Sequence, residues 1–156
     1  MINFFLYKYD ELNTAQLYDI LSFRQNVFIL EQQCFYQDID YKDQHAIHLL
    51  GIKDNQLIAY LRFLPKGTAY ADEASFGRII THEKHKKIGL GKLIMKKLLD
   101  YFDSNYPKDT MLINAQCYLQ SFYEGFGFQT IGDAYDDCGV MHIDMRRRSI
   151  DIGLKL

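Results

Sequence analysis

The sequence of 156 residues has no tryptophan, only two prolines and only three cysteines. Because no proline-rich linker divides the chain, we expect one domain over residues 1–156. The cysteines are far apart and form no Cys-x-x-Cys pair, which favours reduced thiols and a cytoplasmic protein over a disulfide scaffold. No apolar run approaches membrane-spanning length, and the N-terminus lacks the features of a signal peptide, so we expect no membrane partner.

The net charge of −2 argues against nucleic acid as the main partner, since nucleic-acid-binding domains are usually basic. The charge is unevenly distributed. Residues 84–97 contain six lysines and no acidic residue, whereas the charged residues between 31 and 54 are mostly acidic. A basic surface near residue 90 and an acidic surface near residue 40 suit an anionic cofactor and a cationic acceptor.

Residues 85–92 form the most informative local motif and read His-Lys-Lys-Ile-Gly-Leu-Gly-Lys. They follow an apolar, strand-like segment and lead into an apolar pattern of helical spacing. In such an arrangement the glycines let an anion approach the backbone, and the first N–H groups of the helix can bind it. Leu93 and Ile94 exclude a Walker A loop and a dinucleotide fingerprint. An ordinary glycine turn followed by a solvated lysine face is the alternative interpretation.

Apolar periodicity and turn residues predict an α/β chain, a mixed sheet with helices on its faces, in the order β-α-β-β-β-α-β-α-β-β. The predicted strands are residues 2–9, 48–53, 57–64, 74–81, 111–116, 128–134 and 140–145, and the predicted helices are residues 14–30, 90–102 and 119–126. Residues 31–43 have no clean period, so we expect a functional loop there. Residues 146–156 read as a basic C-terminal tail.

Several motifs resemble those of the GCN5-related N-acetyltransferases (GNATs). Lys86-x-x-Gly89-x-Gly91 is similar to the pyrophosphate-binding loop of that superfamily, although the usual first residue is arginine or glutamine. Tyr123-x-x-x-Gly-Phe128 is similar to a second signature of the superfamily. Four further segments resemble the ElaA-like branch, namely residues 27–34, 36–43, 77–78 and 137–145.

The resemblance implies the acyl-CoA N-acyltransferase fold and an acetyl-CoA-dependent N-acetyltransferase that transfers the acetyl group directly to a primary amine. By family position, the cofactor would be bound by Ile79, Ile80, Thr81, Lys86, Lys87, Ile88, Gly89, Leu90, Gly91, Lys92, Gln116 and Tyr123. Tyr123 is also the implied general acid, because a phenol of pKa about 10 is well matched to a thiolate leaving group. The alternative for Tyr123 is an aromatic core residue.

Glu31 and His142 are the two candidates for the general base. Arg78 is expected either to bind substrate or to pair with the acidic loop, since a charge on a central strand needs a partner. Cys34 is assigned to the substrate site as well, where a buried inert thiol is favoured over a nucleophile because no adjacent base is evident. Asp40, in the acidic stretch 36–43, is also assigned to the substrate site. We expect this stretch to contact a cationic amine, either a small molecule or a peptide.

Two other functions compete with catalysis. One is a non-catalytic acyl-CoA-binding module that keeps the glycine loop without turnover. The other is a metal-binding regulatory domain built on Asp38, Asp40, Asp43, His45 and His48, although this segment lacks the glycine and glutamate of a calcium loop. We predict no metal site. The acceptor's identity and the choice between a monomer and a homodimer stay open.

Overall fold

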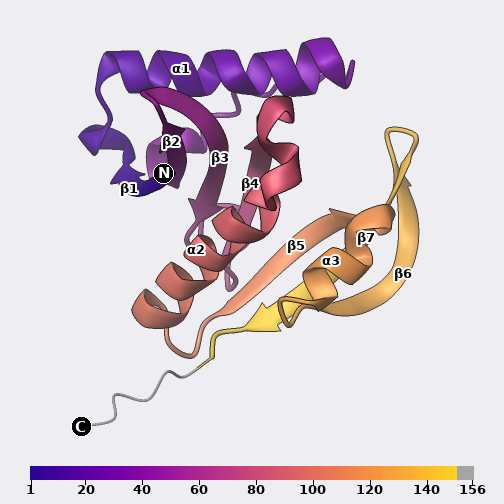
Figure 1. Ribbon diagram of the computed structural model, residues 1–156. Coiled ribbons are helices and arrows are strands. Elements are labelled where there is room, and N and C mark those ends of the chain that lie inside the picture. The colour runs from indigo at the N-terminus through magenta and orange to yellow at the C-terminus, as the bar shows by residue number, and fades with distance from the viewer. Residues whose placement is uncertain (151–156) are drawn as a thin grey trace, which may run out of the picture.

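The computed structural model describes residues 1–150, which fold in the predicted element order (Figure 1). The strands are β1 (Asn3–Lys8), β2 (Ile47–Lys53), β3 (Gln56–Leu64), β4 (Ser75–Thr81), β5 (Thr110–Gln116), β6 (Gln129–Asp137) and β7 (Val140–Arg148). The α-helices are α1 (Thr14–Arg24), α2 (Leu90–Asn105) and α3 (Gln120–Glu124). The α/β class and the β-α-β-β-β-α-β-α-β-β order are therefore confirmed.

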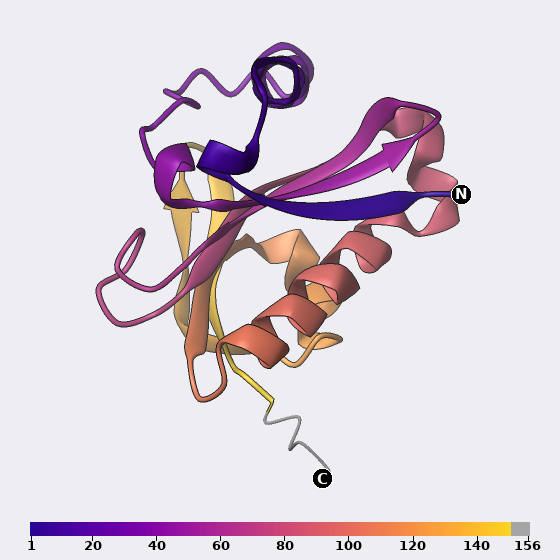
Figure 2. The same ribbon diagram turned by 90° about the vertical axis from the view of Figure 1, so that its left-hand side faces the viewer.

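The first sheet has the order β1-β2-β3-β4, and all of its strands are antiparallel. Figure 2 shows α1 and α2 on opposite faces of this sheet. Side chains that alternate along β3 therefore enter two separate cores. Leu61 and Phe63 pack in the larger core with α2, whereas Tyr60 packs in the smaller core with Ile20 of α1. Burial on both faces explains why the β3 sequence is a nearly continuous apolar run.

The predicted helix at residues 14–30 begins as expected and changes form partway along. Asn13 caps α1, because its side chain accepts a hydrogen bond from the Gln16 N–H (2.8 Å) and the Gln16 side chain accepts one from the Asn13 N–H (2.9 Å). After Arg24 the hydrogen bonding widens into a π-helical turn, Gln25–Glu31. Such turns occur often at functional sites, and this one leads directly into the aperiodic loop.

The second sheet has the antiparallel order β5-β7-β6 and is joined to the first at one point. Ala74, just before β4, pairs in parallel with Met111 of β5. The Ala74 N–H donates to the Thr110 carbonyl and the Leu112 N–H donates to the Ala74 carbonyl, both at 2.9 Å. Beyond this bridge β4 and β5 diverge (Figure 1). The mixed character of the sheet thus lies in this parallel contact between two antiparallel halves.

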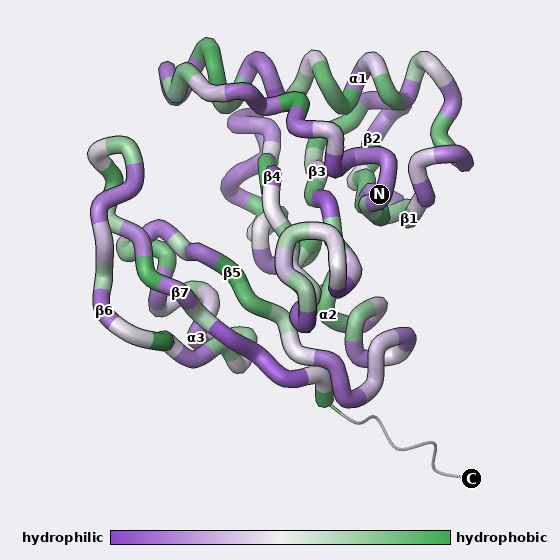
Figure 3. The backbone as a smooth tube through the Cα atoms, turned by 180° about the vertical axis from the view of Figure 1, so that it is seen from behind, coloured by the Kyte–Doolittle hydropathy of each residue, from purple (hydrophilic) through white to green (hydrophobic). Residues whose placement is uncertain are grey.

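The prediction of a tail from residue 146 onward was wrong at its start. Strand β7 continues to Arg148, in a hydrophilic stretch of the tube in Figure 3. Two of its three arginines pair with carboxylates from other parts of the fold. Arg147 donates two hydrogen bonds of 2.8 Å to buried Asp103 of α2, and Arg146 donates two to Glu73. The rest of the predicted tail, residues 151–156, lies outside the described residues.

Within residues 1–150, none of the helices is both long enough and apolar enough to span a membrane. The helix α2 is instead amphipathic, as its spacing predicts. Leu90, Ile94, Leu98 and Phe102 are buried against the sheets, whereas its lysines are exposed. The fold therefore directs the basic face of α2 to solvent and fixes the position of its N-terminus.

The Arg147–Asp103 pair generates a stability prediction. Arg147→Ala should lower the free energy of unfolding by about 3 kcal/mol, because it leaves a buried carboxylate without its partner. Arg148→Ala is the matched control, since Arg148 is exposed and makes no ion pair within residues 1–150. Urea denaturation of both variants measures the difference, and equal losses would contradict the assignment.

The same pair has a defined pH dependence. Burial acts to raise the pKa of Asp103, but hydrogen bonds from Arg147 and from the Ile150 N–H outweigh it, so the pKa lies below its ordinary value. A carboxyl group with a lowered pKa in the folded state stabilises the protein above its unfolded pKa of about 4. The contribution is lost as the pH falls through the lowered pKa, so the gap between parent and Arg147→Ala should narrow in acid.

Candidate active site

A cavity of about 700 Å³ opens where β4 and β5 diverge. Its walls come from the loop after the π-helical turn, from β4, from β5 with the start of α3, and from the β6–β7 hairpin. A second cavity of about 360 Å³ adjoins it, since Gln32 and Ile79 line both. Ile80, Thr81, Lys86 and Glu31 also line this smaller cavity. One edge of β4 thus passes along both cavities.

β4 bulges at the point where the two cavities meet. Tyr60 of β3 lies opposite Ile80, whereas Arg62 lies opposite Gly77, so Arg78 and Ile79 together occupy the space opposite one β3 residue. Such a bulge interrupts the ladder and redirects nearby side chains. Arg78 has a φ of 53°, a left-handed conformation that is strained for a residue with a Cβ. The strain is sustained by contacts of the Arg78 side chain.

The glycine loop leaves open space at the N-terminus of α2. Gly89 has a φ of 70° and is the N-cap of α2, with no side-chain cap. A Cβ at Gly89 would meet no heavy atom within 4 Å, and one at Gly91 would meet only the Phe122 ring at 3.9 Å. The first N–H groups of α2 have no carbonyl partner in the helix. Lys86 pairs with Glu83 in the turn that precedes Gly89.

Tyr123 lies in α3 and lines the large cavity, although only 5% of its surface is exposed. Its ring packs against Phe76 of β4 and Phe128, with centroid distances of 5.9 and 6.0 Å. Burial raises the pKa of Tyr123 to about 12, so the hydroxyl is protonated at neutral pH. Within residues 1–150 the hydroxyl makes no hydrogen bond, which leaves its proton available to a group in the cavity.

His142 lies opposite Gln116 in the β5–β7 ladder, and both side chains line the large cavity. The His142 Nδ1 lies 2.8 Å from the Val140 carbonyl oxygen. A carbonyl can only accept, so Nδ1 carries the hydrogen and the neutral ring has its lone pair on Nε2. Tyr135 stacks on the ring at 6.2 Å and 24°. His142 is therefore held in the tautomer that accepts a proton at Nε2.

Glu31, the other candidate base, ends the π-helical turn and is exposed. It lines the smaller cavity beside Lys86 and does not line the cavity that contains Tyr123 and His142. Cys34 does line the large cavity and is exposed, so the expectation of a buried thiol was wrong. The aperiodic loop bends away from the helix after residue 32 and carries this side chain into the opening.

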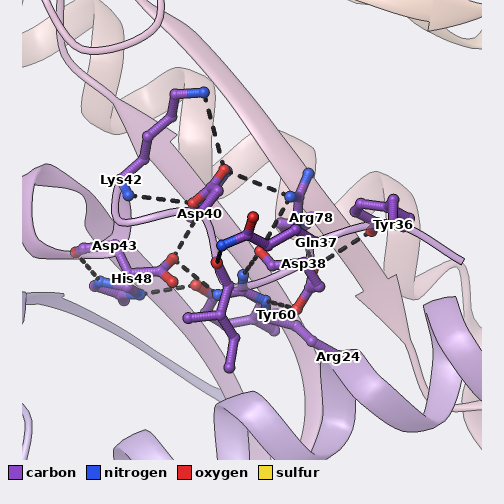
Figure 4. Close-up of polar contacts among 12 residues, drawn as sticks. Arg24, Tyr36, Gln37, Asp38, Asp40, Lys42, Asp43, His48, Tyr60 and Arg78 are labelled. Atoms are coloured by element: carbon purple, nitrogen blue, oxygen red, sulfur yellow. Dashed lines mark hydrogen bonds and ion pairs between the residues drawn. The ribbon is translucent and has the colours of Figure 1, made fainter.

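The acidic loop, residues 36–43, is held by a charge cluster that Figure 4 shows in close-up. Arg24 and Arg78 both donate to Asp38, at 2.9 and 2.6 Å. Asp40 accepts two hydrogen bonds from Arg62, at 2.7 and 2.6 Å. We call this set of charged side chains the arginine–aspartate cluster; its members are Arg24, Arg62, Arg78, Asp38, Asp40 and Asp43.

The cluster corrects the role expected for Asp40. Burial acts to raise the pKa of Asp40, but the hydrogen bonds and charge of Arg62 outweigh it and hold the pKa well below its usual range. Neither cavity is lined by Asp40. The Asp40 carboxylate therefore pairs with arginine side chains of the protein itself. For Arg78 the structure favours the ion-pair alternative, although the residue also lines the large cavity and lies over the Tyr36 ring at 5.1 Å.

The metal hypothesis finds no support in the same region. Both ring nitrogens of His48 are occupied, Nδ1 by the Tyr60 hydroxyl at 2.8 Å and Nε2 by the Asp43 carbonyl at 2.9 Å. The carboxylates nearby face guanidinium groups. In the part of the chain that the structure describes, no three His, Cys, Asp or Glu side chains are grouped to hold a metal ion.

Sequence reasoning assigned no role to several residues that line the large cavity. They include Asn114, Tyr118, Asp137 and Cys138. Asp137 shares a motif with His142, and that shared motif was the one available signal. Tyr118 and Cys138 lie in turns, where one-dimensional periodicity does not tell which way a side chain faces. Asn114 lies within β5, and no motif marked it.

The cluster predicts that Asp40→Asn destabilises the fold. It removes one of three carboxylates facing three buried or half-buried guanidinium groups, so we expect a loss of about 2 kcal/mol in the free energy of unfolding. Asp133→Asn, on the exposed part of β6, removes the same charge and serves as the control. Urea denaturation measures both. An Asp40→Asn variant as stable as the control would mean that the cluster contributes no stability.

Comparisons with known proteins agree with this geometry. Residues 11–149 match the model of the acetyltransferase (GNAT) domain. The chain is 37% identical over 144 residues to protein ElaA of Escherichia coli, covering 91% of this chain and 94% of ElaA. The crystal structure of E. coli ElaA superposes with a TM-score of 0.87 at 36% identity, covering 94% of this chain and 99% of that one.

A second solved structure, an acyl-CoA N-acyltransferase from Pseudomonas aeruginosa, gives a TM-score of 0.88 at 30% identity, with coverage of 94% of this chain and 99% of that one. The matches extend across both sheets and the three α-helices, so they include every wall of the two cavities. The chain therefore belongs to the GNAT acetyltransferase family and is an ElaA-like member of it.

Proposed function

We propose that this chain is an acetyl-CoA-dependent N-acetyltransferase that transfers the acetyl group directly to a primary amine. Membership of the GNAT family, and a relative described as an acyl-CoA N-acyltransferase, support acyl transfer from coenzyme A. The observation that carries the proposal is the position of Tyr123. Tyr123 lines the large cavity, which adjoins the smaller cavity beside β4 and Lys86, and its hydroxyl is protonated.

The glycine loop, whose Lys86 lines the smaller cavity, fits a coenzyme A pyrophosphate. The space at Gly89 and Gly91 is open to a ligand, and the free N–H groups of α2 suit an anion. The lysines of the loop, Lys86, Lys87 and Lys92, add positive charge, and Ile88 and Leu90 belong to the same segment. The main chain of Ile79, Ile80 and Thr81 on β4, with Gln116, would hold the pantetheine arm. When bound, the thioester supplies the acetyl group.

Direct transfer is supported by the contact between the two cavities, since Gln32 and Ile79 line both. Such an arrangement lets both substrates bind together. Cys34 is exposed at the opening and makes no hydrogen bond to a base within residues 1–150, which argues against a cysteine-bound intermediate. All three cysteines are free thiols, and this supports a cytoplasmic location, where thiols stay reduced.

Proton transfers are assigned to two residues of the large cavity. His142 accepts a proton at Nε2 from the attacking ammonium group, directly or through water, because its Nδ1–H is engaged by Val140. Tyr123 donates its phenolic proton to the sulfur that leaves. The nitrogen loses its second proton as the carbon–sulfur bond breaks, and this proton returns to the Tyr123 phenolate. His142 releases the first proton to solvent, so both residues are restored and one proton is released per transfer.

A non-catalytic acyl-CoA-binding module is the competing function. It would bind acetyl-CoA without releasing coenzyme A in the presence of any amine. An assay that follows free coenzyme A across a panel of amines, beside calorimetric titration of acetyl-CoA, separates the two functions. Binding without turnover for every amine would favour the module.

Gly91→Glu should abolish or strongly weaken acetyl-CoA binding. The glutamate would place a side chain and a negative charge in the space assigned to the pyrophosphate. An acidic residue in the first turn of a helix is otherwise favourable, so α2 itself should remain folded. Gly91→Ala is the control, because its methyl group meets only ordinary contacts. Parent-like affinity in Gly91→Glu, measured by calorimetry, would show that the pyrophosphate lies elsewhere.

Tyr123→Phe removes one hydroxyl and keeps the packed ring. If the hydroxyl protonates the leaving thiolate, single-turnover transfer should slow by roughly 10²–10⁴-fold. The affinity for acetyl-CoA should change much less, because the lost interaction acts in the transition state. Rapid-quench transfer with enzyme in excess avoids masking by slow product release. An unchanged rate would mean that Tyr123 is only a core aromatic residue, and a joint loss of binding and rate would mean that it holds the cofactor.

A further inference from the structure

We propose that the acceptor is an arylalkylamine, a primary amine joined by a short chain to an aromatic ring, and that Asp137 pairs with its ammonium group. This inference rests on the proposed acetyltransferase function and assigns the acceptor class of the same large cavity. It is built from the charges, the aromatic side chains and the hairpin that line that cavity.

The charge of the cavity comes from Asp137. The charged or titratable side chains that line it, apart from the thiols and phenols, are Arg78, Asp137 and His142. The Arg78 guanidinium is engaged by Asp38 at 2.6 Å. Asp137 is exposed and forms no ion pair within residues 1–150. The cavity therefore presents one unbalanced carboxylate, which is suited to a single ammonium group.

Asp137 lies on the same hairpin as His142, the proposed base, and lines the same cavity. In the β6–β7 ladder Asp137 is opposite Val140, whose carbonyl holds the His142 ring. Asp137 and His142 thus line the cavity from the same hairpin, which places the carboxylate and the base on one wall. Residues at the tip of this hairpin and residues of the segment that follows α1 line the same cavity.

Aromatic side chains line two different walls of the opening. Phe35, on the loop after the π-helical turn, is 86% exposed, and Tyr118, in the short turn Cys117–Leu119 before α3, is 76% exposed. Tyr36 is also exposed and is held in place under the Arg78 guanidinium. Large apolar side chains left in solvent around a cavity commonly mark a binding site. An aromatic ring of the acceptor, bound between these walls, would cover the exposed aromatic side chains.

The same lining disfavours other amines. A polyamine would bring several ammonium groups to one unpaired carboxylate and would leave the aromatic walls without an apolar partner. An amino acid would bring a carboxylate, and Arg78, the guanidinium at this wall, is already paired with Asp38. A ring on a short uncharged arm satisfies both the single carboxylate and the aromatic walls.

The test compares four acceptors with the full-length chain: 2-phenylethylamine, n-butylamine, phenylalanine and spermidine. Release of coenzyme A is followed at saturating acetyl-CoA. We expect kcat/KM for 2-phenylethylamine to exceed the other three values by at least about tenfold, the factor that corresponds to one good contact. Preference for spermidine, phenylalanine or butylamine would overturn the proposal.

Two variants test the assigned contacts. Asp137→Asn should raise KM for 2-phenylethylamine about tenfold and leave acetyl-CoA affinity unchanged, because only the acceptor loses a charge partner. Asp136→Asn is the matched control, since the adjacent Asp136 does not line the cavity. Phe35→Ala should reduce the preference for 2-phenylethylamine over butylamine. Equal KM values in Asp137→Asn and Asp136→Asn would overturn the role of Asp137.

A binding experiment separates failure of this inference from failure of the proposed function. Calorimetry titrates 2-phenylethylamine into the chain in the presence of coenzyme A. Binding that weakens in Asp137→Asn, without turnover of any amine, would uphold the acceptor class and remove the catalytic function. Turnover of other amines, with no Asp137-dependent binding of 2-phenylethylamine, would do the reverse. Neither binding nor turnover would remove both.

Discussion

The structure depends on the point at which backbone hydrogen bonding between β4 and β5 stops. The two sheets meet through the bridge at Ala74 and Met111 and then separate, so that β4 keeps one paired edge and one free edge. Unpaired N–H and C=O groups on a strand edge are costly to bury and available to a ligand. Both cavities lie along this free edge, and α2 begins beside it. The separation of the sheets thus creates both cavities.

The arginine–aspartate cluster is what keeps the irregular loop in a fixed position. Arg24 is fully buried, and a buried guanidinium is tolerated only when carboxylates neutralise it. Residues 36–43 supply those carboxylates to α1, β3 and β4. Arg78 joins the loop to the strained bulge in β4, and so connects the wall of the large cavity to the strand that passes both cavities. The acidic loop therefore has a structural role, because its carboxylates pair with arginine side chains of the protein itself.

Within the large cavity, burial and backbone contacts define the chemistry of ordinary side chains. Burial keeps the Tyr123 phenol protonated, and the Val140 carbonyl selects the tautomer of His142. Neither effect requires an unusual residue. The opposite end of the cavity has a different character, because Phe35, Tyr118 and Asp137 come from separate walls and remain exposed there. The site therefore combines a closed, aromatic interior with an open, charged rim.

The sequence by itself determined the element order, the glycine loop and the family, because periodicity and short motifs are local properties of the chain. It also brought Tyr123 and His142 forward as candidates for one site. Tertiary structure decided the partners of the acidic loop, since Asp40 and Arg62 lie 22 residues apart in sequence and their pairing depends on folding. The tertiary structure also determined that residues 146–148 belong to β7. It placed Glu31 at the smaller cavity and Asp137 at the larger one. Contacts between distant segments have no periodic signature, and for that reason only the fold could reveal them.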